Sequence, residues 1–198
     1  LLLNGCVLQD VAVGEKGGVL FLDAETKATI HNTTFINCIS HFGGAVYIEG
    51  LNTALSGCTF YDVTARTSGE AVRSGSSKFH GSAFQQHISA QFSGAIALAG
   101  SAAIDSCRFD SSSAGADGGA LFVNIFESPI ESSTFANVSA SSGGGVSCYG
   151  ALNLTACTLS RNEASVSGGG VHLSSPGILT TAGTRLYQNV TKSGGGFY

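Results

Sequence analysis

The sequence has little of what several protein classes require. Only 11% of its 198 residues are charged, against roughly 25% in soluble domains, and it contains 2 Pro, no Met and no Trp. No apolar run approaches the roughly 18 residues of a membrane-spanning helix, so we expect no membrane span in this segment. The 9 basic and 13 acidic residues leave a net charge of −4 with no basic stripe. We therefore expect no nucleic acid partner.

Glycine, by contrast, is abundant and periodic. Gly-Gly or a near variant begins at positions 17, 43, 69, 93, 118, 143, 168 and 194, at steps of 24 to 26 residues. Apolar positions separated by one variable residue follow each copy, as in GGAVYI and GGALFV. A fixed period of this length is typical of a solenoid. We expect each glycine pair to mark a corner where the backbone needs a positive φ or closely approaches the neighbouring rung.

A second element recurs with the same period. It reads apolar, two variable residues, Cys or Ser or Thr, one variable residue, then Phe or Leu, as in LSGCTF at 55 and IDSCRF at 104. The short runs alternate with period 2, which indicates strands, and no segment sustains a helical period. We predict an all-β fold: a right-handed, single-stranded parallel β-helix of nearly eight rungs of 24–26 residues, with residues 1–198 forming one segment. Length variation falls mainly in the connection from the glycine strand to the second element.

The register of the repeats assigns inward-facing rows. One row stacks aromatic side chains in the core, at Phe35, Phe60, Phe84, Phe109 and Phe135. Another inward position carries cysteine on alternate rungs, at Cys6, Cys58, Cys107 and Cys157, interleaved with Ser and Thr. Two rungs separate Cα atoms by roughly 9.6 Å, beyond the roughly 7 Å that a disulfide spans. We therefore predict free thiols in a Cys/Ser/Thr ladder, and we place Cys38 in a turn.

A polysaccharide lyase or hydrolase is the enzymatic alternative for this architecture. Such enzymes need clustered carboxylates on one sheet face. The outward position of the glycine strands carries no carboxylate pair, and the best cluster is Asp105, Arg108 and Asp110, which we interpret as a solvated charge patch. The cysteine and histidine spacings match no zinc motif, and strands follow the glycines where a phosphate loop needs a helix. We expect no catalytic residues, no metal site and no cofactor.

With the repeat laid out, the chain resembles the polymorphic outer membrane protein repeats of chlamydial autotransporters. Those repeats combine GGA(I/L/V) with FxxN, and related repeats occur in surface proteins of algae and protists. GGAV at 43, SGAI at 93 and GGAL at 118 match the first element. LSRN and LYQN match the second with Leu in place of Phe, and place Asn162 and Asn189 at the Asn position. The resemblance implies a β-helix in an adhesin or surface structural protein.

Four Asn-x-Ser/Thr sequons are candidate N-glycosylation sites, at Asn153, Asn189, Asn137 and Asn32. We expect Asn153 at an outward strand position and Asn189 in a turn, where a glycan fits, whereas Asn32 lies at a tight corner. Glycosylation would imply a eukaryotic source.

These observations favour a non-enzymatic structural or adhesive shaft of an extracellular cell-surface or filament protein, such as an adhesin or a flagellar-hair-like assembly. The alternative is a carbohydrate-active β-helix that binds or cleaves polysaccharide. Cell-surface or polysaccharide ligands are the partners that this interpretation implies. The sequence starts inside one rung and stops inside another, so we expect further rungs or other chains to stack at both ends, within a longer chain.

Overall fold

The computed structural model describes residues 1–50, 53–68, 71–124 and 127–198. Within these ranges the chain forms strands and no helix. Each strand pairs in parallel with the corresponding strand of the neighbouring rung, as between β10 (Val72–Ser74) and β14 (Ile96–Leu98). Alternating short apolar runs favour this pairing, because most strands bury one face more deeply than the other, as β10 does.

The strands form three parallel sheets, and the chain visits them in the order A, B, C in every rung. Sheet A contains β1 (Leu2–Asn4), β4 (Ala28–His31), β7 (Thr53–Ser56), β11 (Ser77–His80), β15 (Ala103–Asp105), β19 (Ser128–Glu131), β23 (Ala151–Thr155) and β27 (Ile178–Ala182). Sheet B contains β2 (Val7–Ala12), β5 (Thr34–Phe42), β8 (Thr59–Tyr61), β9 (Thr64–Ser68), β12 (Ala83–Gln85), β13 (Ile88–Ser89), β16 (Arg108–Asp110), β17 (Ser113–Ala114), β20 (Thr134–Ala136), β21 (Ser139–Ser142), β24 (Thr158–Ser160), β25 (Glu163–Ser167) and β28 (Arg185–Tyr187). Sheet C contains β3 (Leu20–Leu22), β6 (Val46–Ile48), β10, β14, β18 (Leu121–Val123), β22 (Val146–Cys148) and β26 (Val171–Leu173).

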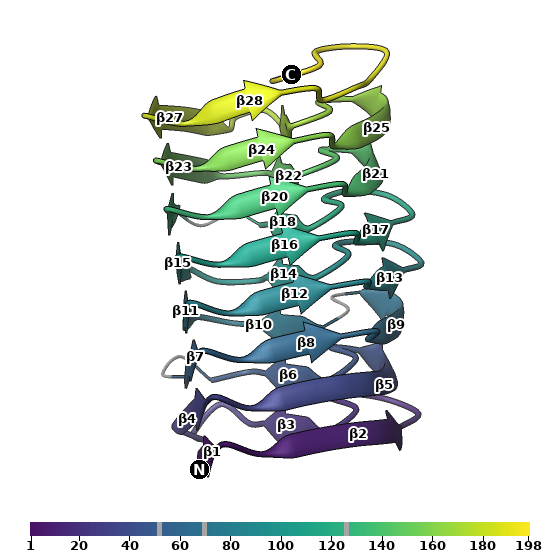
Figure 1. Cartoon of the computed structure of the whole chain (residues 1–198), viewed down its shortest axis with the longest axis vertical. Coiled ribbons are helices and arrows are strands. Elements are labelled where there is room, and N and C mark those ends of the chain that lie inside the picture. The colour runs from purple at the N-terminus through teal and green to yellow at the C-terminus, as the bar shows by residue number, and fades with distance from the viewer. Residues whose placement is uncertain (51–52, 69–70, 125–126) are drawn as a thin grey trace.

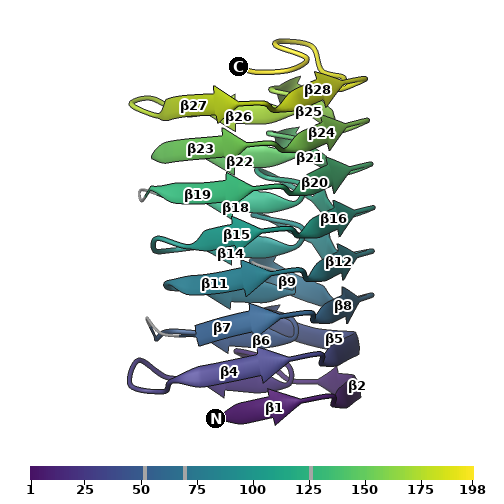
Figure 2. The same cartoon turned by 60° about the vertical axis from the view of Figure 1, so that its left-hand side comes forward.

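The stacked rungs form a right-handed coil. In Figure 1 the near strands of sheet B run from left to right while the chain climbs from its N-terminus at the bottom to its C-terminus at the top. Figure 2 brings sheet A forward and shows one strand per rung. Eight strands in sheet A and seven in sheet C give about seven turns, and the eighth repeat adds a bridge from Phe197 to Val171. The predicted parallel β-helix is confirmed.

The core contains the predicted aromatic stack. The rings of Phe35, Phe60, Phe84, Phe109 and Phe135 are fully buried. Successive centroids lie 4.6, 4.8, 4.9 and 4.7 Å apart, with interplanar angles of 3–8°. The ring spacing equals the spacing of hydrogen-bonded strands, so identical side chains stack without a change of rotamer from one rung to the next.

The glycine pairs have the two roles that the sequence predicts. The first glycine has a positive φ, for example 57° at Gly43 and 71° at Gly118. The second lies against the next rung: a Cβ on Gly119 would be 2.1 Å from the carbonyl oxygen of Gly144. Two further corners of the rung also use left-handed residues, many of them not glycine, such as Asn32 (φ 46°) and Asp62 (φ 51°). Asn and Asp tolerate this conformation better than most residues.

The Cys/Ser/Thr ladder is also present, and all six cysteines are free. Its alternation has a physical reason. The backbone N–H of Cys58 donates to Ser82 Oγ at 3.2 Å, that of Cys107 to Ser133 Oγ at 3.1 Å, and that of Cys157 to Thr184 Oγ1 at 3.3 Å. Each hydroxyl therefore accepts a hydrogen bond from the backbone N–H of the cysteine in the adjacent rung. The prediction for Cys38 was wrong: it lies in β5, fully buried, because the second half of β5 continues the sheet past the corner at Asn37.

Candidate functional site

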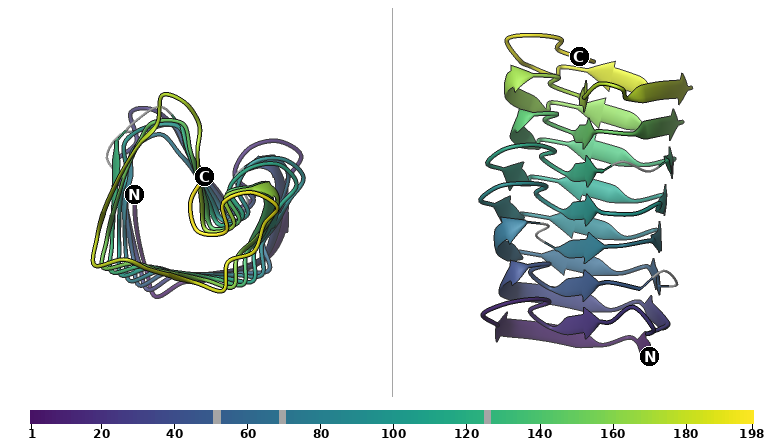
Figure 3. Two further views of the ribbon diagram at one scale, coloured as in Figure 1. Left: turned by 90° about the horizontal axis from the view of Figure 1, so that it is seen from above. Right: turned by 180° about the vertical axis from the view of Figure 1, so that it is seen from behind.

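The outline of the rungs bends inward on one side. Viewed along the axis, the stack has a re-entrant cross-section, and the C-terminal segment lies beside the bend (Figure 3). Phe197 of that segment bridges to Val171 in β26, which places the outer face of sheet C at the bend. Residues just before the glycine pairs, such as Phe42 and Phe92, form the opposite wall of a hollow whose other wall includes Arg73 and Phe122. We call the space between these walls the concave groove.

Planar side chains follow the concave groove from rung to rung, and we call this set the aromatic track. It consists of Phe21, Phe42, Tyr47, Arg73, Phe92, Phe122, Tyr149, His172 and Tyr198. Several members are strongly exposed for aromatic side chains: Phe21 at 49%, Tyr149 at 39% and Tyr198 at 60%. The outward position of sheet C supplies most of them, because Phe21, Tyr47 and Arg73 are consecutive register partners.

Ring contacts connect neighbouring members of the track. The centroids of Phe21 and Tyr47 lie 5.7 Å apart, and those of Phe92 and Phe122 lie 5.1 Å apart. Phe122 continues to Tyr149 at 5.5 Å. In the last rungs His172 stacks on Tyr198 at 5.4 Å. The planar groups therefore support one another on a surface otherwise rich in small residues.

Two cations lie over ring faces of the track. Lys16 Nζ is 4.7 Å from the Tyr47 centroid and pairs with Glu49 Oε1 at 2.8 Å. This hydrogen bond to Glu49 raises the pKa of the Lys16 ammonium. The Arg73 guanidinium carbon is 5.8 Å from the centroid of Phe42 and 5.9 Å from that of Tyr47. Both cations are engaged by aromatic groups, so they extend the flat surface more than they create a positive patch.

The groove deepens at its centre into a hollow of about 280 Å³. Aromatic rings of Phe42, Phe92 and Phe122 line it, with neutral hydrogen-bonding side chains of Thr67, Gln91 and Asn124 at its rim. Nearby, the hydroxyl of Ser147 is fully buried and has no hydrogen-bond partner among the described residues. Ser147 occupies the register position between Phe122 and His172. The site thus combines apolar faces and uncharged donors and acceptors with the guanidinium of Arg73.

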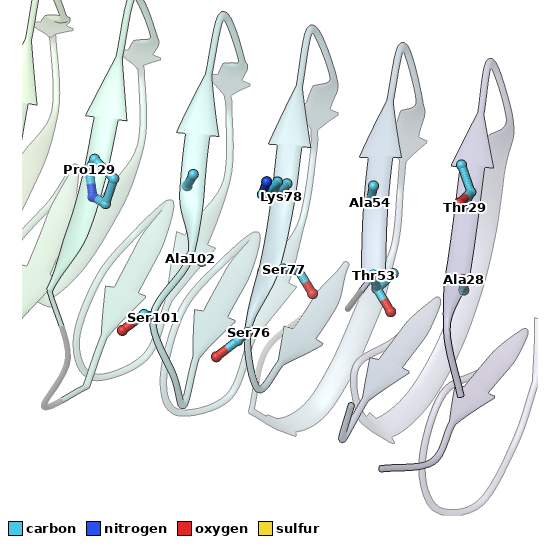
Figure 4. A pocket seen from close by; sticks show the side chains of 11 residues that line it. Ala28, Thr29, Thr53, Ala54, Ser76, Ser77, Lys78, Ser101, Ala102 and Pro129 are labelled. Carbon is cyan, nitrogen blue, oxygen red and sulfur yellow. The ribbon is translucent and has the colours of Figure 1, made fainter. Parts of the chain in front are cut away.

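A second hollow, of about 470 Å³, lies on the outer face of sheet A (Figure 4). Small side chains form its floor, including Thr29, Ala54 and Ala103, and Lys78 lies among them. It forms where the connection from sheet C to sheet A is short: β10 ends at Ser74 and β11 begins at Ser77. In the first rung the same connection runs from Leu22 to Ala28, which confirms the predicted place of length variation. We call this hollow the sheet A notch.

The carboxylates of the best predicted cluster do not converge. Asp105 lies 2.8 Å from His80 Nδ1, whereas Asp110 accepts a 2.7 Å hydrogen bond from Arg108. Burial alone would raise the pKa of Asp110, but hydrogen bonds from Asn137, Arg108 and Ser111 outweigh it and lower the pKa. Each of the two carboxylates therefore contacts its own basic side chain, which is typical of a charge patch.

Among the described residues, no three His, Cys, Asp or Glu side chains gather as a metal site would require. In the same residues, no helix has the length and apolar character needed to cross a membrane.

The four sequon asparagines differ in accessibility. Asn32 and Asn137 are exposed at left-handed corners, and Asn153 is half-buried on the outer face of β23, with its Nδ2 donating to Glu127 Oε1 at 2.9 Å. Asn189 lies outside the strands, but its Nδ2 donates inward to the carbonyl of Leu159 at 3.0 Å. Glycosylation requires that nitrogen. The Nδ2 atoms of Asn137 and Asn153 bond to side-chain carboxylates, whereas that of Asn189 bonds to a backbone carbonyl of the neighbouring rung, which makes Asn189 the poorest acceptor of the four.

Comparison with family models, with curated proteins and with solved structures gave no match. The resemblance to the polymorphic outer membrane protein repeats therefore stays a prediction. The aromatic track is what sequence reasoning missed. Its sheet C members occupy the outward position of the glycine strands, for which the sequence shows only that no carboxylate pair is present. Phe42, Phe92 and Tyr149 occupy other register positions. The signal was available as an excess of outward Phe and Tyr near the glycine pairs.

Proposed function

We propose that this chain is a non-enzymatic shaft of an extracellular cell-surface or filament protein, with a structural and adhesive role. The observation that carries the proposal is the continuity of its stacking. Three parallel sheets and the phenylalanine stack run through the described rungs. At about 4.8 Å per rung, seven turns make a rod roughly 35 Å long. Such a rod suits a spacer that presents a surface at a fixed distance.

The composition of the surface supports an extracellular setting. Gly is abundant in the sequence, few charges are present, and Asn153 offers an outward sequon on a strand. Glycans on such a surface would keep parallel shafts soluble and separate. The free cysteines are compatible with this setting because their burial, and not a reducing compartment, prevents pairing. Burial raises the pKa of the Cys107 thiol to about 11, which keeps it protonated.

The proposal includes a second chain stacked on each end of the shaft. Leu3 and Leu8 of the first rung and Leu186 of the last are only partly buried, whereas their partners Ile30, Phe35 and Leu159 are fully buried. A neighbouring rung would cover these side chains and pair the open strand edges.

Antibodies raised against the folded chain test the location. They should label intact cells of the source organism, and labelling only after permeabilisation contradicts the extracellular proposal.

Small-angle scattering of the chain tests the rod-like shape. We expect the cross-section of the particle to stay constant as the protein concentration rises, while its length grows by end-to-end stacking. A compact monomer at all concentrations contradicts the stacking.

A carbohydrate-active role is the second candidate, and the aromatic track favours its binding form. Because Asp105 and Asp110 lie on different sheets and each contacts its own basic side chain, we expect no release of products from pectin or alginate. Product release that is lost in Asp105→Asn would support the enzyme.

A further inference from the structure

We propose that the aromatic track binds one extended, neutral, β-linked polysaccharide chain, laid parallel to the shaft axis in the concave groove. The proposal rests on the adhesive function above and names the chemistry of its ligand. Its test does not depend on the cellular location or on the rod-like shape, so the two proposals fail separately.

The first argument is the segregation of aromatic residues. Four described phenylalanines lie outside the inward-facing rows, Phe21, Phe42, Phe92 and Phe122, and all four belong to the track. Three of the five tyrosines join them. Exposed aromatic surface is unfavourable in water, and here most of it lies along one face, with Tyr61 and Tyr187 of sheet B as exceptions. This concentration indicates a binding surface.

The second argument is the linear repeat of the site. The track supplies a planar group at nearly every rung, and the rungs follow one another at about 4.8 Å. Phe42 and Phe92 stand two rungs apart, at about 9.6 Å, close to the repeat of a disaccharide unit in an extended β-1,4-linked chain. A polymer with a regular repeat can therefore contact equivalent groups along the whole groove.

The third argument is the chemistry of the lining. Sugar rings present flat C–H faces that stack on aromatic rings, with hydroxyl groups at their edges. The central hollow offers the rings of Phe92 and Phe122 beside the uncharged groups of Gln91 and Asn124. The cation of Lys16 is paired with Glu49, so Lys16 offers little net charge to an anion.

A peptide fits this site less well. An extended peptide binds a sheet by pairing with a free strand edge. Each middle strand of sheet C is already paired on both sides, for example β14 with β10 and β18. The groove therefore offers a peptide only side-chain contacts.

Affinity electrophoresis of the full 198-residue chain tests the proposal, with hydroxyethyl cellulose, xylan, pectate or alginate in the gel. We expect retardation by hydroxyethyl cellulose or xylan, and tighter binding of cellohexaose than of cellobiose by calorimetry. The double variant Phe92→Ala/Phe122→Ala should weaken binding roughly tenfold or more, because two stacking surfaces are lost. Both side chains reach the surface, so we expect the variant to keep its far-UV circular dichroism spectrum.

The chain offers a matched control. Tyr61 and Tyr187 are exposed aromatic residues of sheet B, at 41% and 49%, away from the groove. The variant Tyr61→Ala/Tyr187→Ala should bind like the parent. The proposal is overturned if none of the four polymers retards the chain, or if the groove variant binds as tightly as the control. Binding to pectate or alginate alone, lost in high salt, would also overturn it, because charge would then replace stacking.

Discussion

Asn162 and Asn189 occupy the same position in successive rungs, and the backbone N–H of Asn162 donates to Oδ1 of Asn189 at 3.0 Å. Asn162 repeats the arrangement one rung below: its Oδ1 accepts from the N–H of Val138 at 3.3 Å, and its Nδ2 donates to the carbonyl of Phe135 at 3.2 Å. Each asparagine side chain therefore satisfies two backbone groups at the corner of the preceding rung. This gives the asparagine of the LSRN and LYQN elements a physical role.

The variant Asn162→Ala should lower the free energy of unfolding by about 1–3 kcal/mol, because it leaves the buried N–H of Val138 without its partner. Asn153→Ala, on the outer face of β23, is the control and should change it by less than about 0.5 kcal/mol. Denaturant titration of protein from a bacterial host, where no glycan is attached, measures both. Equal effects would refute the assigned role of the asparagine side chain.

Close approach between glycines gives a second prediction. A Cβ on Gly119 would meet the carbonyl oxygen of Gly144 at 2.1 Å and that of Ser139 at 2.7 Å, whereas a Cβ on Gly14 would meet nothing within 4 Å. We expect Gly119→Ala to cost about 3 kcal/mol or more, since backbone must move. Gly14→Ala should be neutral or slightly stabilising. Thermal melts of the two variants compare them, and a stable Gly119→Ala protein would contradict the packing of the rungs.

The buried imidazole of His87 predicts a dependence on pH. Its Nδ1 accepts from the N–H of Val63 at 3.3 Å, and burial lowers its pKa to about 3, from about 6.5 in an unfolded chain. Below pH 6.5 the unfolded chain binds a proton that the folded chain does not, so stability falls as pH falls from 6.5 towards 3. The loss reaches about 2 kcal/mol at pH 5.

The variant His87→Asn isolates this effect, because an amide oxygen can accept from Val63 as Asn162 accepts from Val138. Between pH 7 and pH 5 the unfolding free energy of the variant should decline less than that of the parent. This window lies above the titration of most carboxylates. Parallel curves for the two proteins would show that His87 is not the group responsible.

The thiols give the fourth prediction. Five of the six cysteines are buried, and burial raises the pKa of Cys38 and of Cys107 to about 11. Because the thiolate is the reactive form, we expect Cys6, the partly exposed one, to react first with N-ethylmaleimide at pH 8. All six should react after denaturation without reductant, as counted by mass spectrometry. A pair that stays unreactive would indicate a disulfide and an incorrect register.

The sequence predicts most of the fold because each rung repeats the same local demands. Phe60 and Phe84 could be assigned to one stack from spacing alone, since parallel in-register pairing places equivalent residues next to each other. Cys38 could not be placed, because the left-handed residue Asn37 turns the chain while the strand continues beyond it. The concave groove was also beyond prediction, because Phe92 and Phe122 meet only through the inward bend of the rung. Periodicity determines which residues stack, but not the outline of the cross-section.

The sheet A notch shows where this chain can change without losing its order. The connection between sheets C and A is two residues long after β10 and five after β3, yet Leu22, Ile48 and Ser74 remain register partners. Insertions or deletions there reshape the outer wall and leave the hydrogen-bonded ladders intact. The surface of the shaft on that side can therefore change in shape and in what it binds, while the paired strands and the core stay the same.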